Sequence, residues 1–287
     1  MKRFPHLAQR LFNTPIAILP AKAEVVMCAL ADRLGIAKLF RADGGTVPLA
    51  MDDWEDDGPG EYRGYELVAD VAIIPVEGTL VQKLGQLRPY SGMCGYDAIR
   101  AGLSMSLEDE RVRAIVLDID SPGGEVAGCF DLVDAIYAAR GTKPIWAILS
   151  ETAFSAAYAI ASAADRICVP RTGGTGSVGV ICLHVDFSQA LATEGIAVTL
   201  IQYGARKSDG SEFKPLSADA LARFQADVDG MGEIFVETVA RNRGLKANAV
   251  RATEATTFLG AAGVKVGLAD AVMSPDAAFA ELVKQLG

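Results

Sequence analysis

The chain has 287 residues, of which 51% are hydrophobic and 22% charged, and its formal net charge is −9. The hydrophobic content excludes a disordered chain, and no run of about 18 apolar residues marks a membrane span. The acidic balance argues against a nucleic-acid-binding protein, which needs a basic surface. We expect a globular protein of one or two domains with a full core.

The N-terminal residues 1–64 are predicted to form an extension and an acidic linker ahead of a main domain, residues 65–287. Apolar residues at helical spacing predict one amphipathic helix over 23–34. The stretch 52–60 is rich in Asp, Gly and Pro, which is typical of a solvated linker. The basic start of the chain lacks a following hydrophobic region, so we expect no secretory signal.

Strands and helices alternate from residue 67 onward. The predicted strands are 71–76, 114–119, 144–149 and 198–201, with short strands near Ile167 and Val178. The predicted helices are 96–107, 126–140, 155–164, one from Phe187 and a long one over 217–242. This alternation predicts an α/β protein with a largely parallel sheet covered on both faces.

The long helix 217–242 carries an apolar stripe that something must cover. Ser217 is a plausible N-cap for it. The stripe recurs every three or four residues from Leu221 to Val239. Both the chain's own sheet and a second subunit could cover it.

The five cysteines indicate a reducing, cytoplasmic compartment. Their number is odd and no Cys-x-x-Cys pair occurs. We therefore interpret them as buried free thiols: Cys28, Cys94, Cys129, Cys168 and Cys182.

Two turns could carry chemistry. The strand 114–119 leads into Asp120-Ser121-Pro122-Gly123-Gly124, where glycine amides could stabilise an oxyanion or simply form a tight turn. Ser155 precedes a small-residue helix, where serine is either an N-cap or a nucleophile.

A nucleophilic serine needs a base, and the chain has only two histidines. His6 lies in the extension, and His184 follows an apolar strand, where a structural role is the simpler interpretation. Lys207, just after the predicted strand 198–201, could serve instead if burial lowered its pKa.

Together these blocks resemble the S49 serine peptidases of the signal-peptide-peptidase-A type. The resemblance rests on Asp118–Gly124, the residues around Ser155 and Gly204–Lys207, and it covers about residues 67–275. It implies an α/β, ClpP/crotonase-like fold: a largely parallel sheet built from ββα units with flanking helices.

The resemblance also implies roles for site residues. Ser155 would be the nucleophile and Lys207 the general base, with oxyanion donors at Gly123 and Gly124. Ser177, in a Thr-Gly-Ser block, would orient the lysine. No metal or cofactor is implied. Where many relatives have Ser-Gly-Gly-Tyr, this chain has two alanines, which we expect to narrow the pocket.

Within the family, the matching branch is that of the phage head-maturation or capsid assembly proteases, through residues 5–15 and 89–93. This implies a homo-oligomeric serine endopeptidase of a phage or prophage, acting in the host cytoplasm or the procapsid. Its expected partners are scaffold, portal or capsid proteins, with its own chain as a further candidate, and neither nucleic acid nor a membrane anchor. Because the sequence ends at Gly287, we expect no scaffold segment in cis.

Three alternatives remain open at this point. One is a protease that degrades signal peptides or other cellular peptides. Another is a crotonase-like acyl-CoA enzyme, since one fold can host both chemistries. The third is an inactive assembly or scaffold-binding protein.

Overall fold

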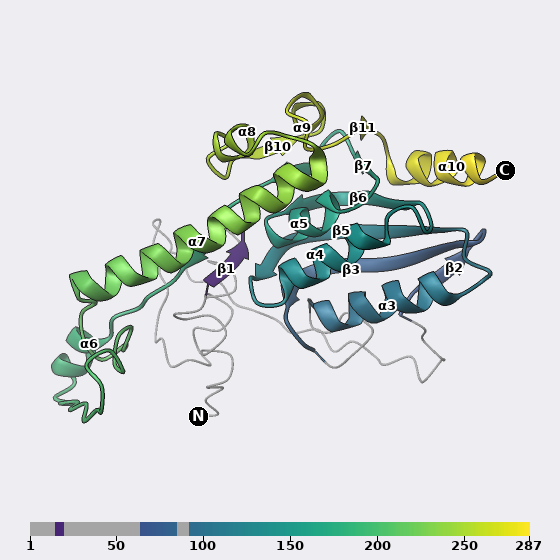
Figure 1. Ribbon diagram of the computed structural model, residues 1–287. Helices are drawn as coiled ribbons and strands as arrows, with labels where there is room; N and C mark the ends of the chain where they lie inside the picture. The colour runs from purple at the N-terminus through teal and green to yellow at the C-terminus, as the bar shows by residue number, and fades with distance from the viewer. Residues whose placement is uncertain (1–14, 20–63, 85–91) are drawn as a thin grey trace.

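The computed structural model describes residues 15–19, 64–84 and 92–287 (Figure 1). The predicted helix 23–34, the acidic linker and most of the two phage-type motifs lie outside these ranges. The strands are β1 Pro15–Ile18, β2 Glu66–Val68, β3 Val71–Val81, β4 Met93–Gly95, β5 Ala114–Glu125, β6 Ile145–Phe154, β7 Arg166–Val169, β8 Gly174–Gly176, β9 Ile181–Cys182, β10 Thr257–Leu259 and β11 Ala271–Val272. The helices are α3 Tyr96–Glu108, α4 Cys129–Ala139, α5 Ala156–Ser162, α6 Ser188–Thr193, α7 Ala218–Arg243, α8 Ala247–Arg251, α9 Ala261–Lys265 and α10 Pro275–Leu286.

The centre of the molecule is a parallel sheet. Strands β3, β5, β6 and β7 lie side by side in that order and all run parallel. Because both faces of this sheet are covered, residues 114–117 of β5 are all buried, which explains their unbroken apolar sequence. The predicted α/β class with a largely parallel sheet is confirmed.

Helices cover the two faces unequally. Helices α3, α4 and α5 pack on one face with the last turns of α7, whereas α10 covers part of the other (Figure 1). On the first face, Ile115, Leu117 and Tyr158 are fully buried. On the second, Trp146 and Leu282 belong to a smaller core cluster. None of the helices within the described ranges is long and apolar enough to cross a bilayer.

The central strands change neighbours where they end. The first part of β6 pairs with β7, but its last residues, Thr152–Phe154, pair with β8. Similarly, the last residues of β5 pair with β1. This fork brings segments that are distant in sequence together at the carboxyl ends of the parallel strands, where sites in such sheets usually lie.

The prediction that the strand ends at residue 119 and turns at the glycines is wrong. Strand β5 continues through the glycines to Glu125, and α4 begins only at Cys129. Gly123, with φ +101°, and a register shift between Glu77 and Thr79 let β5 stay paired to β3 there. Pairing with a neighbour thus overrides the local tendency of Pro-Gly-Gly to turn.

The predicted strand 198–201 is also wrong. These residues are irregular and exposed, and the side chain of Ile201 is 96% exposed. They belong to the loop between α6 and α7, which Figure 1 shows at the free end of α7, away from the sheet. An apolar run does not form a strand where no sheet edge is available to pair with it.

In helix α7 the predicted N-cap, Ser217, is confirmed, but only the last residues of the predicted apolar stripe pack against the core. Ser217 Oγ accepts a hydrogen bond from Ala220 N at 3.2 Å. Phe235 and Val239, near the end of the helix, are fully buried against the core. Leu221, near its start, is 56% exposed, because this part of the helix projects beyond the sheet (Figure 1).

Candidate active site

Ser155 occupies a strained turn between β6 and α5. Its backbone has φ 55° and ψ −122°, a conformation that costs a non-glycine residue roughly 1–3 kcal/mol. It stands at the N-cap position of α5, but its side chain makes no capping hydrogen bond. Instead, Oγ donates to the Gly179 carbonyl at 3.4 Å. The geometry therefore favours a nucleophile presented on a sharp strand-to-helix turn over a capping serine.

The surroundings hold this turn in place. Ser155 N donates to the Gly176 carbonyl at 2.9 Å, and the Ser155 carbonyl accepts from Ala159 N at 2.9 Å. Tyr158, one turn into α5, is fully buried and donates from its hydroxyl to the Leu268 carbonyl at 2.9 Å. These bonds fix the start of the helix, so the strain at Ser155 persists in the folded state.

The two alanines of the serine block lie inside the core. Ala156 and Ala157 are both 0% exposed and belong to the main hydrophobic cluster. Their methyl groups therefore fill the interior under the turn.

Gly123 lies directly beside Ser155. A Cβ added at Gly123 would lie 3.0 Å from Ser155 Cβ, so any larger residue would crowd the serine. The Gly123 amide donates to Ser121 Oγ at 3.1 Å, and that hydroxyl donates to the Gly78 carbonyl at 2.6 Å. At Gly124, an added Cβ would overlap the Leu80 carbonyl of β3. The glycines are thus required by close packing, and Gly123 is also adjacent to the serine.

Ser177 is near the same point. It follows Gly176, whose carbonyl binds Ser155 N, and it has φ 55° and is 6% exposed. Its own amide donates to the Thr256 carbonyl at 3.1 Å. The structure therefore brings together Ser155, Gly123 and the segment from Gly176 to Gly179.

Lys207 is not part of this group within one chain. It is exposed, and its amide donates to the Gly204 carbonyl at 3.1 Å in the loop between α6 and α7. Figure 1 shows this loop at the end of α7 far from α5. The other base considered, His184, follows β9, but Ser155 Oγ donates to a carbonyl and not to its imidazole.

Two features of the site were missed from the sequence. The first is β1, which lies along Gly123–Glu125, the end of β5. Only its short apolar run could have indicated a strand. The second is an acidic group in which Asp118 and Asp120 face Glu77 across β3 and β5. Burial and then these two carboxylates raise the pKa of Glu77. Their alternation in the sequence could have placed both on one face of the strand.

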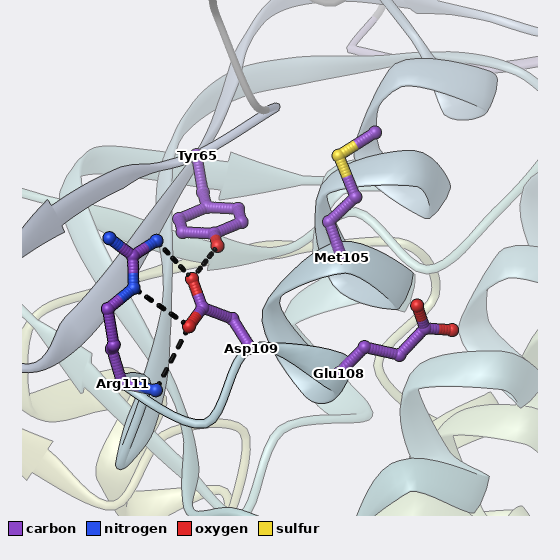
Figure 2. A pocket seen from close by; sticks show the side chains of 5 residues that line it. All are labelled: Tyr65, Met105, Glu108, Asp109 and Arg111. Carbon is purple, nitrogen blue, oxygen red and sulfur yellow. Dashed lines mark hydrogen bonds and ion pairs between the residues drawn. The ribbon is translucent and has the colours of Figure 1, made fainter.

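A surface pocket at the C-terminal end of α3 is lined by side chains that hydrogen-bond to one another (Figure 2). Tyr65 Oη donates to Asp109 Oδ2 at 2.7 Å, and Arg111 Nη2 approaches the same oxygen at 2.6 Å. The guanidinium of Arg111 holds the pKa of Asp109 well below its usual range. Because Asp109 is the C-cap of α3, these bonds tie the end of this helix to the residue before β2 and to the turn that leads into β5.

Comparison with known proteins identifies a protein family and individual relatives to which the sequence is similar. The model of peptidase family S49 matches residues 138–287. The chain is 40% identical over 99% of its length to the head-tail preconnector protein GP5 of Enterobacteria phage P21, and 38% identical over 96% to the capsid assembly protease C of Escherichia phage lambda. It spans 58% and 64% of the lengths of these two relatives.

A cellular relative is more distant. Protease 4 of Haemophilus influenzae is 24% identical over 81% of this chain, which covers 37% of that protein. The family match extends over more than half of the sequence and includes the strained serine and the segment from Gly176 to Gly179, whereas Gly123 lies outside it. The chain belongs to peptidase family S49.

Proposed function

We propose that this protein is a serine endopeptidase that cleaves scaffold, portal or capsid proteins during phage or prophage head maturation. The observation that carries the peptidase proposal is Ser155: buried, strained and free of a capping role beside Gly123. The names of the two phage relatives support the substrate class and an assembly role in the host cytoplasm or the procapsid.

In the proposed reaction, Ser155 Oγ attacks a peptide carbonyl and Lys207 takes up its proton. The amides of Gly123 and Gly124 would stabilise the oxyanion, once the Gly123 amide turns from Ser121 Oγ to the substrate. Lys207 would then protonate the leaving amine, and water would hydrolyse the acyl-enzyme. Ser177, next to the Gly176 carbonyl that binds Ser155 N, would orient the lysine amine.

A neighbouring copy of the chain would supply the lysine. Lys207 is exposed and lies in the loop between α6 and α7, which Figure 1 shows far from α5, the helix that follows Ser155. Burial of Lys207 at a subunit contact would both bring it to a serine and lower its pKa. The projecting part of α7, which starts close to this loop, and the segment 259–272 are the surfaces proposed for the contact.

The test uses the full chain with Ser155→Ala, Lys207→Ala and, as a matched control from the same loop, Lys214→Ala. Each form is co-expressed with candidate scaffold and portal proteins, and the products are identified by mass spectrometry. We expect cleavage by the wild type and by Lys214→Ala, and none by the other two. A fluorophosphonate probe should label Ser155 in the wild type and in Lys214→Ala, but not in Lys207→Ala.

Mixing the inactive forms tests the lysine's origin. Co-assembled Ser155→Ala and Lys207→Ala chains should regain part of the activity, because some sites then combine an intact serine with an intact lysine. Absence of Ser155 labelling on folded wild type would overturn the peptidase proposal. Full activity of Lys207→Ala would overturn the dyad, and an inactive mixed assembly would overturn a lysine from a second copy.

A further inference from the structure

Strand β1 lies between the two segments that flank the candidate nucleophile. On one side it pairs antiparallel with β5, with Ile16 opposite Glu125 and Ile18 opposite Gly123. On its other side it pairs antiparallel with β9, with Pro15 opposite Cys182. Leu19 N extends the first ladder by donating to the Pro122 carbonyl at 2.9 Å. The chain's own N-terminal segment therefore fills the space between β5 and β9.

The register of β1 places a main-chain carbonyl next to Ser155. Ala17 lies opposite Gly124 in the ladder. Its carbonyl oxygen also lies close to the preceding residue, Gly123, and a Cβ added there would overlap it. The same added Cβ would lie 3.0 Å from Ser155 Cβ. The Ala17 carbonyl oxygen and Ser155 Cβ thus both lie on the side of Gly123 where a side chain would stand.

Burial shows how closely the groove fits this segment. Ile16 is 4% exposed, Ala17 1% and Ile18 6%. Because side chains alternate along a strand, Ala17 points to the face opposite that of the two isoleucines. The groove thus encloses a small side chain at the residue whose carbonyl faces Ser155, with a larger aliphatic side chain on either side.

We propose that the groove between β5 and β9 is the substrate-binding site, that polypeptides bind there as an extended strand in the orientation of β1, and that β1 must leave before they can enter. The substrate class is an extended segment with a small residue at the position of Ala17. This deepens the proposed peptidase function and rests on it only for the attack by Ser155.

The nature of the contacts explains why β1 can be replaced. The ladders to β5 and β9 use main-chain groups, which any extended peptide can satisfy equally. As part of the same chain, β1 competes at an effective concentration that a free peptide must exceed. Occupation of the groove by β1 would therefore slow the entry of a substrate without preventing it, since β1 leaves reversibly.

A reversible lock tests the proposal in the full-length chain. Pro15→Cys faces the free Cys182 across the ladder, and the spacing of antiparallel partners suits a disulfide. The background is Ser155→Ala, so that binding is measured without cleavage. The probe is a fluorescein-labelled peptide with the sequence of residues 15–19, followed by anisotropy.

We expect oxidation of Pro15→Cys, with the link to Cys182 verified by mass spectrometry, to weaken peptide binding at least tenfold and reduction to restore it. Pro15→Cys combined with Cys182→Ser is the matched control and should not respond to oxidant. A release form, Ile16→Asp with Ile18→Asp, should bind the peptide at least tenfold more tightly than its parent. A peptide with Trp at the position of Ala17 should bind at least tenfold more weakly.

Equal affinity of the cross-linked and reduced forms would overturn the proposal, as would a release form that binds no more tightly. Equal binding of the Trp peptide would overturn the small-residue preference. Failure of the peptidase proposal has a different signature: the release form with Ser155 restored is not labelled by the fluorophosphonate probe, while the anisotropy of the Ser155→Ala forms still follows the lock.

Discussion

Cys129 lies directly under the serine turn, where its Sγ approaches the Ala156 carbonyl at 3.8 Å. The residue is 0% exposed, and burial raises the pKa of its thiol from 9.0 to about 12. A hydrogen bond with Tyr96 opposes this shift but is weaker than the burial. The thiol therefore stays neutral and unreactive in the folded protein at neutral pH.

The sign of this shift predicts an alkaline loss of stability. The unfolded thiol releases its proton near pH 9, whereas the folded one keeps it to about pH 12. The contribution to stability is complete below pH 9 and is lost as pH rises toward 12. Urea unfolding between pH 8 and 11 should give a free energy of unfolding that falls less steeply for Cys129→Ala than for the wild type. Parallel slopes would contradict this.

At the scale of elements, contact between strands decides where glycine is required. Gly124 of β5 lies against β3, and an added Cβ would overlap the Leu80 carbonyl, a main-chain atom that cannot turn aside. At Gly230, within α7, no described atom outside the helix's own nearby backbone comes within 4 Å of an added Cβ. The same substitution should therefore have opposite effects at the two positions.

We expect Gly124→Ala to lower the free energy of unfolding by about 3 kcal/mol, because β3 and β5 must move apart. Gly230→Ala should raise it by up to about 1 kcal/mol, because alanine favours the helix. Chemical denaturation of both variants measures the difference. Similar free energies of unfolding for the two variants would show that β3 and β5 can move apart with little loss of stability.

At the scale of the whole molecule, the described residues cover α7 along only part of its length. Its last turns are buried in the core, but its first turns carry apolar side chains that the described part of the chain leaves partly exposed. The loop with Lys207 adjoins this end of the helix. A contact between copies at this surface would cover the apolar stripe and would bring Lys207 to the Ser155 of a second copy.

Leu221→Glu should therefore reduce assembly without unfolding the chain. The side chain is 56% exposed, so a charge there should change stability by less than about 0.5 kcal/mol. Sedimentation velocity should show smaller species than the wild type, and cleavage activity should fall in parallel. The control is Ala222→Glu, the neighbouring exposed residue, which should keep the wild-type size. A wild type that is monomeric at micromolar concentration would contradict this expectation.

Some features were determined by the sequence alone, because they depend on neighbours in the chain. The apolar run 114–119 marks a strand buried on both faces, and Ser217 marks the start of α7. The position of Ser155 at a strand-to-helix junction could also be predicted, whereas the residues around it left open whether it caps the helix or acts as a nucleophile. Helix periodicity, capping and burial patterns are local, so the sequence suffices for them.

Tertiary structure decided the rest, because it depends on partners far along the chain. Pairing with β3 and β1 keeps Gly123 and Gly124 in a strand, where their sequence predicts a turn. The lack of a sheet edge leaves residues 198–201 irregular. The same long-range packing separates Lys207 from Ser155 and places the Ala17 carbonyl beside the serine. Local sequence sets which conformations a segment prefers, but only the assembled sheet determines which groups meet at its carboxyl edge.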